Sequence, residues 1–191
     1  MLVTVGSPTA AAIDRVLADA HATALTYGEV GASLGDERPA GYRHDRWSVA
    51  LGRGGAAFDR GVEGLNRWEG HRHAGIAVHP ADIPPAAGAD VALVIPLGPL
   101  TLTVANRIVV VEHEDRRFAV VYGTLPGHGE QGEEAFVINR HDDDTVTFDI
   151  VAFSRPVGFS RFGAPAVRRL QQRATGRYLS GIQQFVKGDV P

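Results

Sequence analysis

The residues Leu100–Tyr122, LTLTVANRIVVVEHEDRRFAVVY, decide how this chain folds. They contain two runs rich in β-branched and apolar residues, Leu100–Glu112 and Arg117–Tyr122, with Glu114-Asp115 as a turn between them. Such residues favour strands, whereas short polar side chains favour turns. A parallel crossover needs a dozen or more residues, so this short connection predicts that the two strands are antiparallel neighbours.

The same pattern continues on both sides of this hairpin. Short turns, such as Gly98-Pro99 and Asp142–Asp144, again separate the strand-forming runs. Besides the two runs above, we expect strands at Tyr42–Leu51, Gly75–His79, Val91–Pro96, Glu134–Arg140 and Thr145–Phe153. The sequence therefore predicts one antiparallel sheet of about seven strands, arranged mainly as a meander.

Helical periodicity occurs before and after the meander. Ser7 is a suitable N-cap for a first helix that ends at Gly28, and a second helix is expected after Gly52–Gly55. The last helix, Ala164–Phe185, carries an apolar stripe of Val167, Leu170, Ala174, Tyr178, Ile182 and Phe185. A long amphipathic helix can bury such a stripe against the concave face of a sheet.

These elements predict an α+β helix-grip fold, in which a curved antiparallel sheet grips a long C-terminal helix, with an extra N-terminal helix. We expect a single domain over residues 1–191, with a helical extension at about 1–40 and the helix-grip core at about 41–187. A chain of this length with 44% hydrophobic residues can bury a sizeable core. Proteins of this shape commonly hold an apolar cavity between the sheet and the final helix.

Several blocks of the sequence resemble domain of unknown function 1990, also called uncharacterised protein family 0548. These blocks are YGEVG at Tyr27–Gly31, LGRGGAAF at Leu51–Phe58, Trp68, YGTLPGHGEQGEEAF at Tyr122–Phe136, FSRP at Phe153–Pro156 and the helix that contains Leu170-Gln171. The resemblance covers nearly the whole chain. It implies a fold similar to the START and Bet v 1-like group, in agreement with the strand order above, and it supplies no established catalytic residues.

The composition excludes several classes of site. The chain has no cysteine, so disulfides, thiol nucleophiles and thiolate metal sites are excluded. A net charge of -3 gives no reason to expect nucleic-acid binding. The N-terminus lacks the features of a signal peptide, and no apolar run approaches the roughly 18 residues of a membrane span. We therefore expect a cytoplasmic protein without a cofactor or metal, and leave its oligomeric state open.

One motif formally fits dinucleotide binding. The residues Gly52–Ala57 match G-x-G-x-x-A, in which glycines let a pyrophosphate approach a helix N-terminus. The motif is followed by an antiparallel meander rather than by the parallel strand and acidic residue of a dinucleotide-binding unit. The sequence therefore favours a tight strand-to-helix turn at this point.

Ionisable side chains are concentrated in the connection after Tyr122. His128 with the carboxylate of Glu133 or Glu134 has the composition of an acid-base pair. Strand alternation sends Glu133 and Glu134 to opposite faces, so at most one faces the interior. We expect His128 and at least one of Glu130, Glu133 and Glu134 at the mouth of the cavity. The alternative is a structural turn with a solvated His128.

Two further groups have both a functional and a structural interpretation. His71, His73 and His79 have the spacing of same-face strand residues that can chelate a metal, or they belong to an exposed polar face. Arg169, Arg173 and Arg177 form one stripe on the last helix. That stripe is suited to a phosphate, a carboxylated ligand, a membrane surface or an acidic partner, or it is a solvated helix face.

The sequence predicts that the chain binds a small, mainly apolar or amphipathic molecule between the sheet and the terminal helix. The candidate ligand-binding residues lie on elements that face the expected cavity: Trp68, Tyr122, Thr124, His128, Arg155, Leu170, Ala174 and Tyr178. Two alternatives stay open because fold alone does not choose between them. One is an enzyme that uses His128 as acid-base, and the other is an interaction protein that uses the arginine stripe.

Overall fold

The structure is a computed structural model that describes residues 1–81, 83–158 and 164–188. Its strands are β1 (Leu2–Val5), β2 (Arg43–Arg53), β3 (Ala77–His79), β4 (Asp90–Leu97), β5 (Leu100–Glu114), β6 (Arg117–Thr124), β7 (Glu130–Arg140) and β8 (Thr145–Pro156). Its helices are α1 (Ala10–His21), α2 (Gly54–Asn66), α3 (Glu69–His73) and α4 (Ala164–Lys187), with a short 3-10 turn, η1, at Ala32–Leu34.

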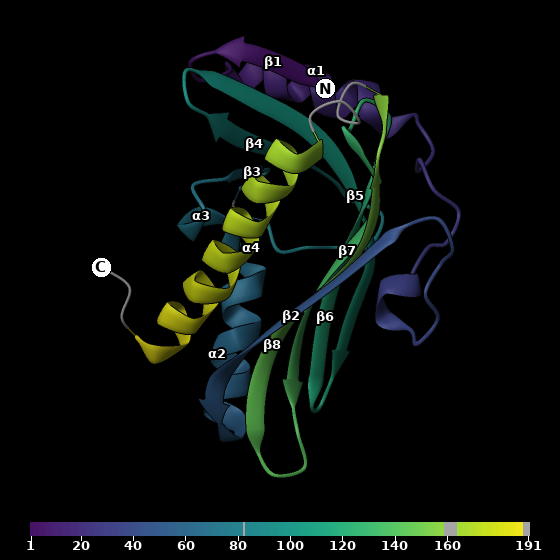
Figure 1. The fold of residues 1–191 in the computed structure, drawn as a ribbon. Coiled ribbons are helices and arrows are strands. Elements are labelled where there is room, and N and C mark those ends of the chain that lie inside the picture. Colours follow the sequence, from purple (N-terminus) through teal and green to yellow (C-terminus); the bar gives the residue numbers. More distant parts are fainter. Residues whose placement is uncertain (82, 159–163, 189–191) are drawn as a thin grey trace.

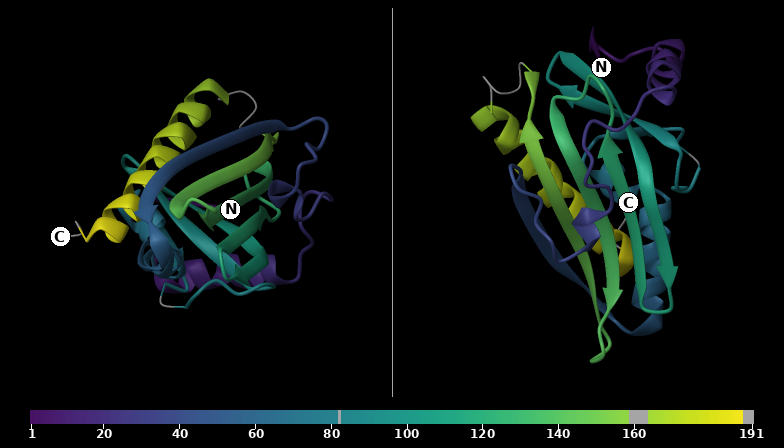
Figure 2. Two further views of the ribbon diagram at one scale, coloured as in Figure 1. Left: turned by 90° about the horizontal axis from the view of Figure 1, so that it is seen from below. Right: turned by 90° about the vertical axis from the view of Figure 1, so that its right-hand side faces the viewer.

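All strand pairs in the described residues are antiparallel, in the order β2-β8-β7-β6-β5-β4-β3, and β1 pairs with β5. Figure 1 shows the sheet curving around α4, with α2 and α3 beside that helix. α1 and η1 pack on the opposite, convex face (Figure 2). The predicted α+β helix-grip architecture is therefore confirmed.

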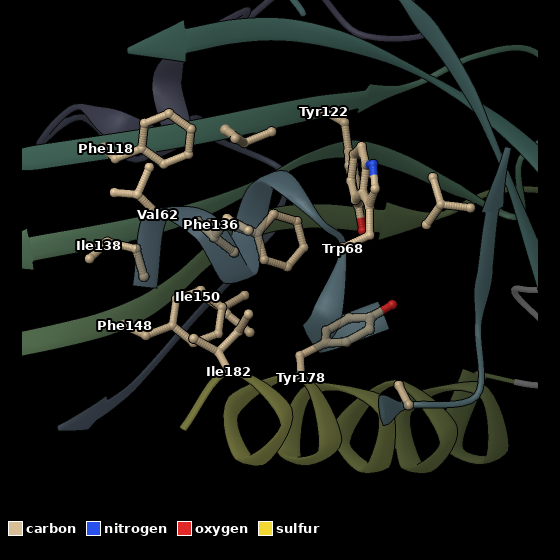
Figure 3. Close-up of a cluster of buried hydrophobic side chains, with 14 of the residues drawn as sticks. Val62, Trp68, Phe118, Tyr122, Phe136, Ile138, Phe148, Ile150, Tyr178 and Ile182 are labelled. Atoms are coloured by element: carbon tan, nitrogen blue, oxygen red, sulfur yellow. The ribbon is translucent and has the colours of Figure 1, made fainter. Parts of the chain in front are cut away.

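The period of two along the strands divides the buried side chains between these two faces. Phe136 and Ile138 of β7 face α2, α3 and α4 and belong to the main core, which Figure 3 shows in part. Ala135 and Val137, the residues between, belong to a smaller cluster on the convex face. Because both faces are covered here, the stretch Ala135–Ile138 within β7 is a continuous apolar run rather than an alternating one.

Most strand boundaries differ from the sequence prediction by one to three residues, and larger differences occur in the helices, at β1 and at the start of β7. α1 begins after Thr9, whose side chain accepts a hydrogen bond from the Ala12 amide, and it ends at His21. The second predicted helix divides at Trp68, which takes a left-handed conformation with φ of 58°. β1 was not predicted, because a strand of four residues leaves little periodicity to detect. β7 begins at Glu130 because the register with β8 extends the pairing beyond Glu134.

α4 approaches α3 closely where a glycine faces a histidine. A Cβ added to Gly181 would lie 2.5 Å from the Cβ of His73. A Cβ on Gly176, one and a half turns earlier on the same helix, would have no heavy atom within 4 Å. The close contact of α4 with α3 therefore requires Gly181.

We predict that Gly181→Ala lowers the free energy of unfolding by about 1–3 kcal/mol, because the methyl group overpacks the contact with α3. The control Gly176→Ala should raise it by up to about 1 kcal/mol, because alanine favours the helix. Urea denaturation measures both changes. A stabilising effect at both positions would contradict the close packing of α4 on α3.

Candidate functional site

The two adjacent glutamates of β7 lie on opposite faces of the sheet. Glu134 pairs with Tyr122 of β6, and both are on the concave face with Phe136. Glu133 is on the convex face, where it contacts η1. The two glutamates that the sequence offered as candidates therefore belong to two different environments.

On the concave face, Glu134 belongs to a polar cluster within the apolar core. The Tyr122 hydroxyl donates a hydrogen bond of 2.8 Å to Oε2 of Glu134. The same hydroxyl lies 3.5 Å from Nε2 of His71 on α3. The His71 ring lies 4.6 Å from the Tyr178 ring of α4 and 5.1 Å from that of Trp68, measured between ring centres. Figure 3 shows Tyr178 pointing from α4 toward the sheet, on the side where Trp68 and Tyr122 lie.

Burial shifts the pKa of every titratable member of this cluster. It raises the pKa of Glu134 to about 7, against the hydrogen bond from Tyr122, and the negative charge of Asp45 adds to the rise. Burial lowers the pKa of His71 to about 3, so this imidazole is neutral. Burial and the nearby Glu134 carboxylate raise the pKa of both Tyr122 and Tyr178. At neutral pH, Glu134 is therefore the group in the cluster that exchanges a proton.

The free space beside this cluster is small. A cavity of about 10 Å³ is lined by Leu65, Trp68, Gly70, His71, Val120, Phe136, Phe148 and Tyr178. That volume holds about one water molecule. The apolar cavity expected from the sequence is thus nearly closed in this structure.

A larger hollow, of about 160 Å³, lies between the segment around η1 and the strands β2 and β8. Its lining is mixed, with Arg38 and Arg46 as well as Asp36 and Glu37. This hollow is open to solvent and contains none of the ligand-binding residues predicted from the sequence.

Glu133 is fully engaged in holding the N-terminal segment to the convex face. Its carboxylate accepts hydrogen bonds from the Tyr27 hydroxyl (2.8 Å) and the Gly31 amide (2.8 Å). It also accepts bonds from the amide (3.0 Å) and hydroxyl (2.5 Å) of Ser33. A carboxylate with four donors around it has little remaining capacity for a substrate. Glu133 therefore anchors the segment around η1 to the sheet.

His128 lies in the β6–β7 turn, away from the Glu134 cluster. Its Nδ1 accepts a hydrogen bond of 3.0 Å from the Glu130 amide. Burial lowers its pKa to about 4, and the nearby N-terminal amine of Met1 adds to this. None of the contacts of His128 involves Glu134 or the residues around the small cavity. The structure thus places this candidate acid-base in a turn that it helps to shape.

Thr124 and Arg155 are also committed elsewhere. The Thr124 hydroxyl lies 2.6 Å from that of Thr26 and accepts a bond of 3.0 Å from the Gly132 amide. Nε of Arg155 donates to Gln131 at 2.7 Å, and its guanidinium lies 4.5 Å from the centre of the Tyr42 ring. The structure does not bring either residue to the concave cluster.

On α4, Ala174 is partly buried and packs against the main core, and Tyr178 is buried. The side chain of Leu170, another predicted contact, lies outside what the structure describes. Of the predicted ligand-binding residues, Trp68, Tyr122 and Tyr178 therefore meet in the cluster, and Ala174 lies on the same core-facing side of α4.

The predicted same-face arrangement of histidines is wrong. His71 and His73 lie on the helix α3, where residues two apart point in different directions. His71 is buried, whereas His73 is exposed. Over the residues that the structure describes, no group of three His, Asp or Glu side chains is placed to hold a metal ion.

Two residues of this region were missed at the sequence level. Asp45 of β2 accepts a bond of 2.6 Å from Nε of Arg43 and is 3.3 Å from Arg168 of α4. Although burial opposes it, these two arginines lower the pKa of Asp45. His71 was considered only as a metal ligand. The positions of Asp45 and His71 in this region depend on tertiary structure, so no local pattern in the sequence signals them.

Comparison with solved structures identifies the class of protein. Hypothetical protein jhp0584 from Helicobacter pylori has a TM-score of 0.54 at 12% identity, over 82% of this chain and 95% of that protein. A START superfamily protein from Mycobacterium smegmatis has a TM-score of 0.50 at 10% identity, over 78% of this chain and 100% of its own. The fold is therefore that of the START and Bet v 1-like helix-grip proteins.

Sequence comparison then identifies the family. The model of the domain of unknown function DUF1990 matches residues 26–181, and the chain belongs to this family. A UPF0548 protein from Deinococcus radiodurans is 32% identical over 182 residues, which are 90% of this chain and 92% of that protein. The resemblance found in the sequence blocks is thus confirmed. In the described part of the chain, none of the helices is long and apolar enough to cross a membrane.

We predict that Glu133→Ala lowers the free energy of unfolding by about 3 kcal/mol or more, because buried donors of Tyr27 and Ser33 lose their charged acceptor. The control Glu29→Ala removes an exposed glutamate of the same segment and should change the free energy of unfolding far less. Urea denaturation distinguishes the two. Equally small losses would show that Glu133 is not an anchor.

The Glu134 carboxyl should make stability depend on pH. Its pKa of about 7 in the folded protein exceeds the ordinary value of 4.5, so the folded state binds the proton more tightly. The free energy of unfolding should therefore fall as pH rises from about 4.5 through 7, by about 3 kcal/mol in total. Glu134→Gln should abolish this part of the slope. Denaturation at pH 5, 6, 7 and 8 tests it, and identical slopes for both proteins would exclude this titration.

Proposed function

We propose that this protein binds a small, mainly apolar molecule between the concave face of the sheet and α4. The observation that carries this proposal is the polar cluster of Glu134, Tyr122, His71 and Tyr178 inside an otherwise apolar helix–sheet interface. Binding sites for small molecules are typically apolar walls with a few convergent polar groups and a shifted pKa. The START-like fold is compatible with this mode of binding.

The ligand space opens by displacement of α4, since the cavity of about 10 Å³ is too small for a ligand. The C-terminal half of α4 packs tightly: a Cβ on Gly181 would clash with His73, and one on Gly64 of α2 would lie 3.1 Å from Phe185. Among the described side chains near residue 170, Arg168 pairs with Asp45 and Gln171 pairs with Arg43. Partly exposed ion pairs stabilise little, so the half around residue 170 is the one that lifts.

Catalysis on the same scaffold is a second candidate, and one observation favours it. Glu134 is partly buried, has a pKa of about 7 and lies beside the Tyr122 hydroxyl, which suits a group that transfers a proton near neutral pH. Glu134 thus replaces His128 as the acid-base of this alternative. Mass spectrometry of the molecule retained during purification separates the two functions: binding returns it unchanged, whereas catalysis converts it in the wild type and not in Glu134→Gln.

The interaction hypothesis has one structural observation in its favour. The side chains of Arg169, Arg173 and Arg177 are exposed. These arginines lie on a different side of α4 from its apolar stripe. A partner that binds the arginine stripe would therefore not occupy the ligand space. The stripe is compatible with ligand binding and does not compete with it.

We predict that the wild-type protein binds the neutral fluorophore N-phenyl-1-naphthylamine in a saturable manner. Ala174→Trp should weaken this binding at least about tenfold, because the indole occupies the space that the ligand uses when α4 lifts. The control Gln172→Trp adds the same group to the exposed face of α4 and should leave binding unchanged. Fluorescence titration measures all three. Equal binding by both variants would indicate dye on a surface patch and contradict the proposal.

A further inference from the structure

Asn106 is a polar residue in the middle of the apolar concave face. It lies on β5 between Val104 and Ile108, and all three side chains point to the same face. Its partner on β4 is Val91, another residue of the main core. The side chain of Asn106 is 1% exposed. Asn106 therefore occupies a position for which the surrounding fold favours an aliphatic residue.

The side-chain nitrogen of Asn106 has no hydrogen-bond partner in the described structure. This atom, Nδ2, is buried. A buried donor without an acceptor destabilises the folded state, and native proteins contain few of them. Packing alone does not account for this residue, because a leucine here would avoid that cost. An acceptor that enters with a ligand accounts for it.

Asn106 is close to the Glu134 cluster. It pairs with Thr124 on β6, and Tyr122 is two residues further along that strand. Residues in this diagonal relation on one face of a sheet are about 7–8 Å apart. Tyr122 in turn donates to Glu134. Glu134 lies one strand further away, on β7. The proposal places one small polar group of a ligand over Tyr122, between the side chains of Asn106 and Glu134.

We infer that the ligand is an apolar molecule with a hydroxyl group, which accepts a hydrogen bond from Asn106 and donates one to Glu134. This inference rests on the proposed function and names its ligand class. A hydroxyl is both a donor and an acceptor, so it satisfies both side chains at once. An ether satisfies only the Asn106 donor. A carboxylate adds a further negative charge beside Glu134 and Asp45, which disfavours fatty acids.

The wild-type protein tests the ligand class directly. 1-Decanol, decyl methyl ether and decanoate are compared by their displacement of N-phenyl-1-naphthylamine at pH 8. We expect 1-decanol to bind at least about tenfold more tightly than either the ether or the acid, because its hydroxyl makes one additional hydrogen bond. Equal affinities, or a preference for decanoate, would overturn the assignment.

Two variants separate a ligand contact from a structural role. Asn106→Leu should raise Tm by at least about 2–4 °C, because it removes a buried unpaired donor. Asn106→Leu should also weaken the binding of 1-decanol and of the ether by about tenfold, and it should leave the binding of the fluorophore unchanged. The control is Thr103→Val. Thr103 is fully buried on the same strand, faces the opposite side of the sheet and also has an unpaired side-chain oxygen. The Thr103→Val variant should raise Tm without altering the binding of 1-decanol.

The outcomes distinguish this inference from the function on which it rests. If the fluorophore does not bind to the wild type, the proposed function fails and the ligand class fails with it. If the fluorophore binds and Asn106→Leu leaves the affinity for 1-decanol unchanged, only the inference fails. If Asn106→Leu does not fold, Asn106 has a structural role in the core, and the comparison of ligands with the wild type decides. A preference for 1-decanol over its ether then supports the inference, and equal affinities overturn it.

Discussion

The two-residue repeat of β7 is the constraint on which the rest of this structure depends. It sends Glu133 to the convex face and Glu134 to the concave face. Glu133 is surrounded by donors from residues 27–33 and holds that segment in place. Glu134 accepts a hydrogen bond from Tyr122, and burial raises its pKa to about 7. Two identical side chains, adjacent in the chain, therefore have a structural and a chemical role that are set by the face each one occupies.

The concave face combines dense apolar packing with polar groups that packing does not require. The neutral His71 imidazole, the two tyrosines and Glu134 contact one another, and Asn106 leaves a donor unpaired nearby. Each of these groups would be replaced by an aliphatic residue if stability were the only requirement. Their presence within one interface is the common basis of the binding proposal and of the hydroxyl-bearing ligand class.

α4 is the element whose displacement would open this interface. Its C-terminal half contacts α2 and α3 through glycines that allow close approach, whereas residues near its start reach β2 through Arg168 and Gln171. A helix held tightly at one end and by partly exposed polar pairs at the other can open the interface without loss of the main core.

The sequence by itself determined the meander of consecutive antiparallel strands and the terminal helix, because short turns and hydrophobic periods of two and of about 3.6 are local properties. It did not determine that β2 pairs with β8 or that β1 pairs with β5. It also determined that Glu133 and Glu134 separate. Only the tertiary structure decided which polar residues meet. His128, Thr124 and Arg155 found partners elsewhere, whereas His71, Asp45 and Asn106 came to the concave face. These contacts join strands and helices far apart in the chain, and their register and burial, rather than their local pattern, fix the chemistry.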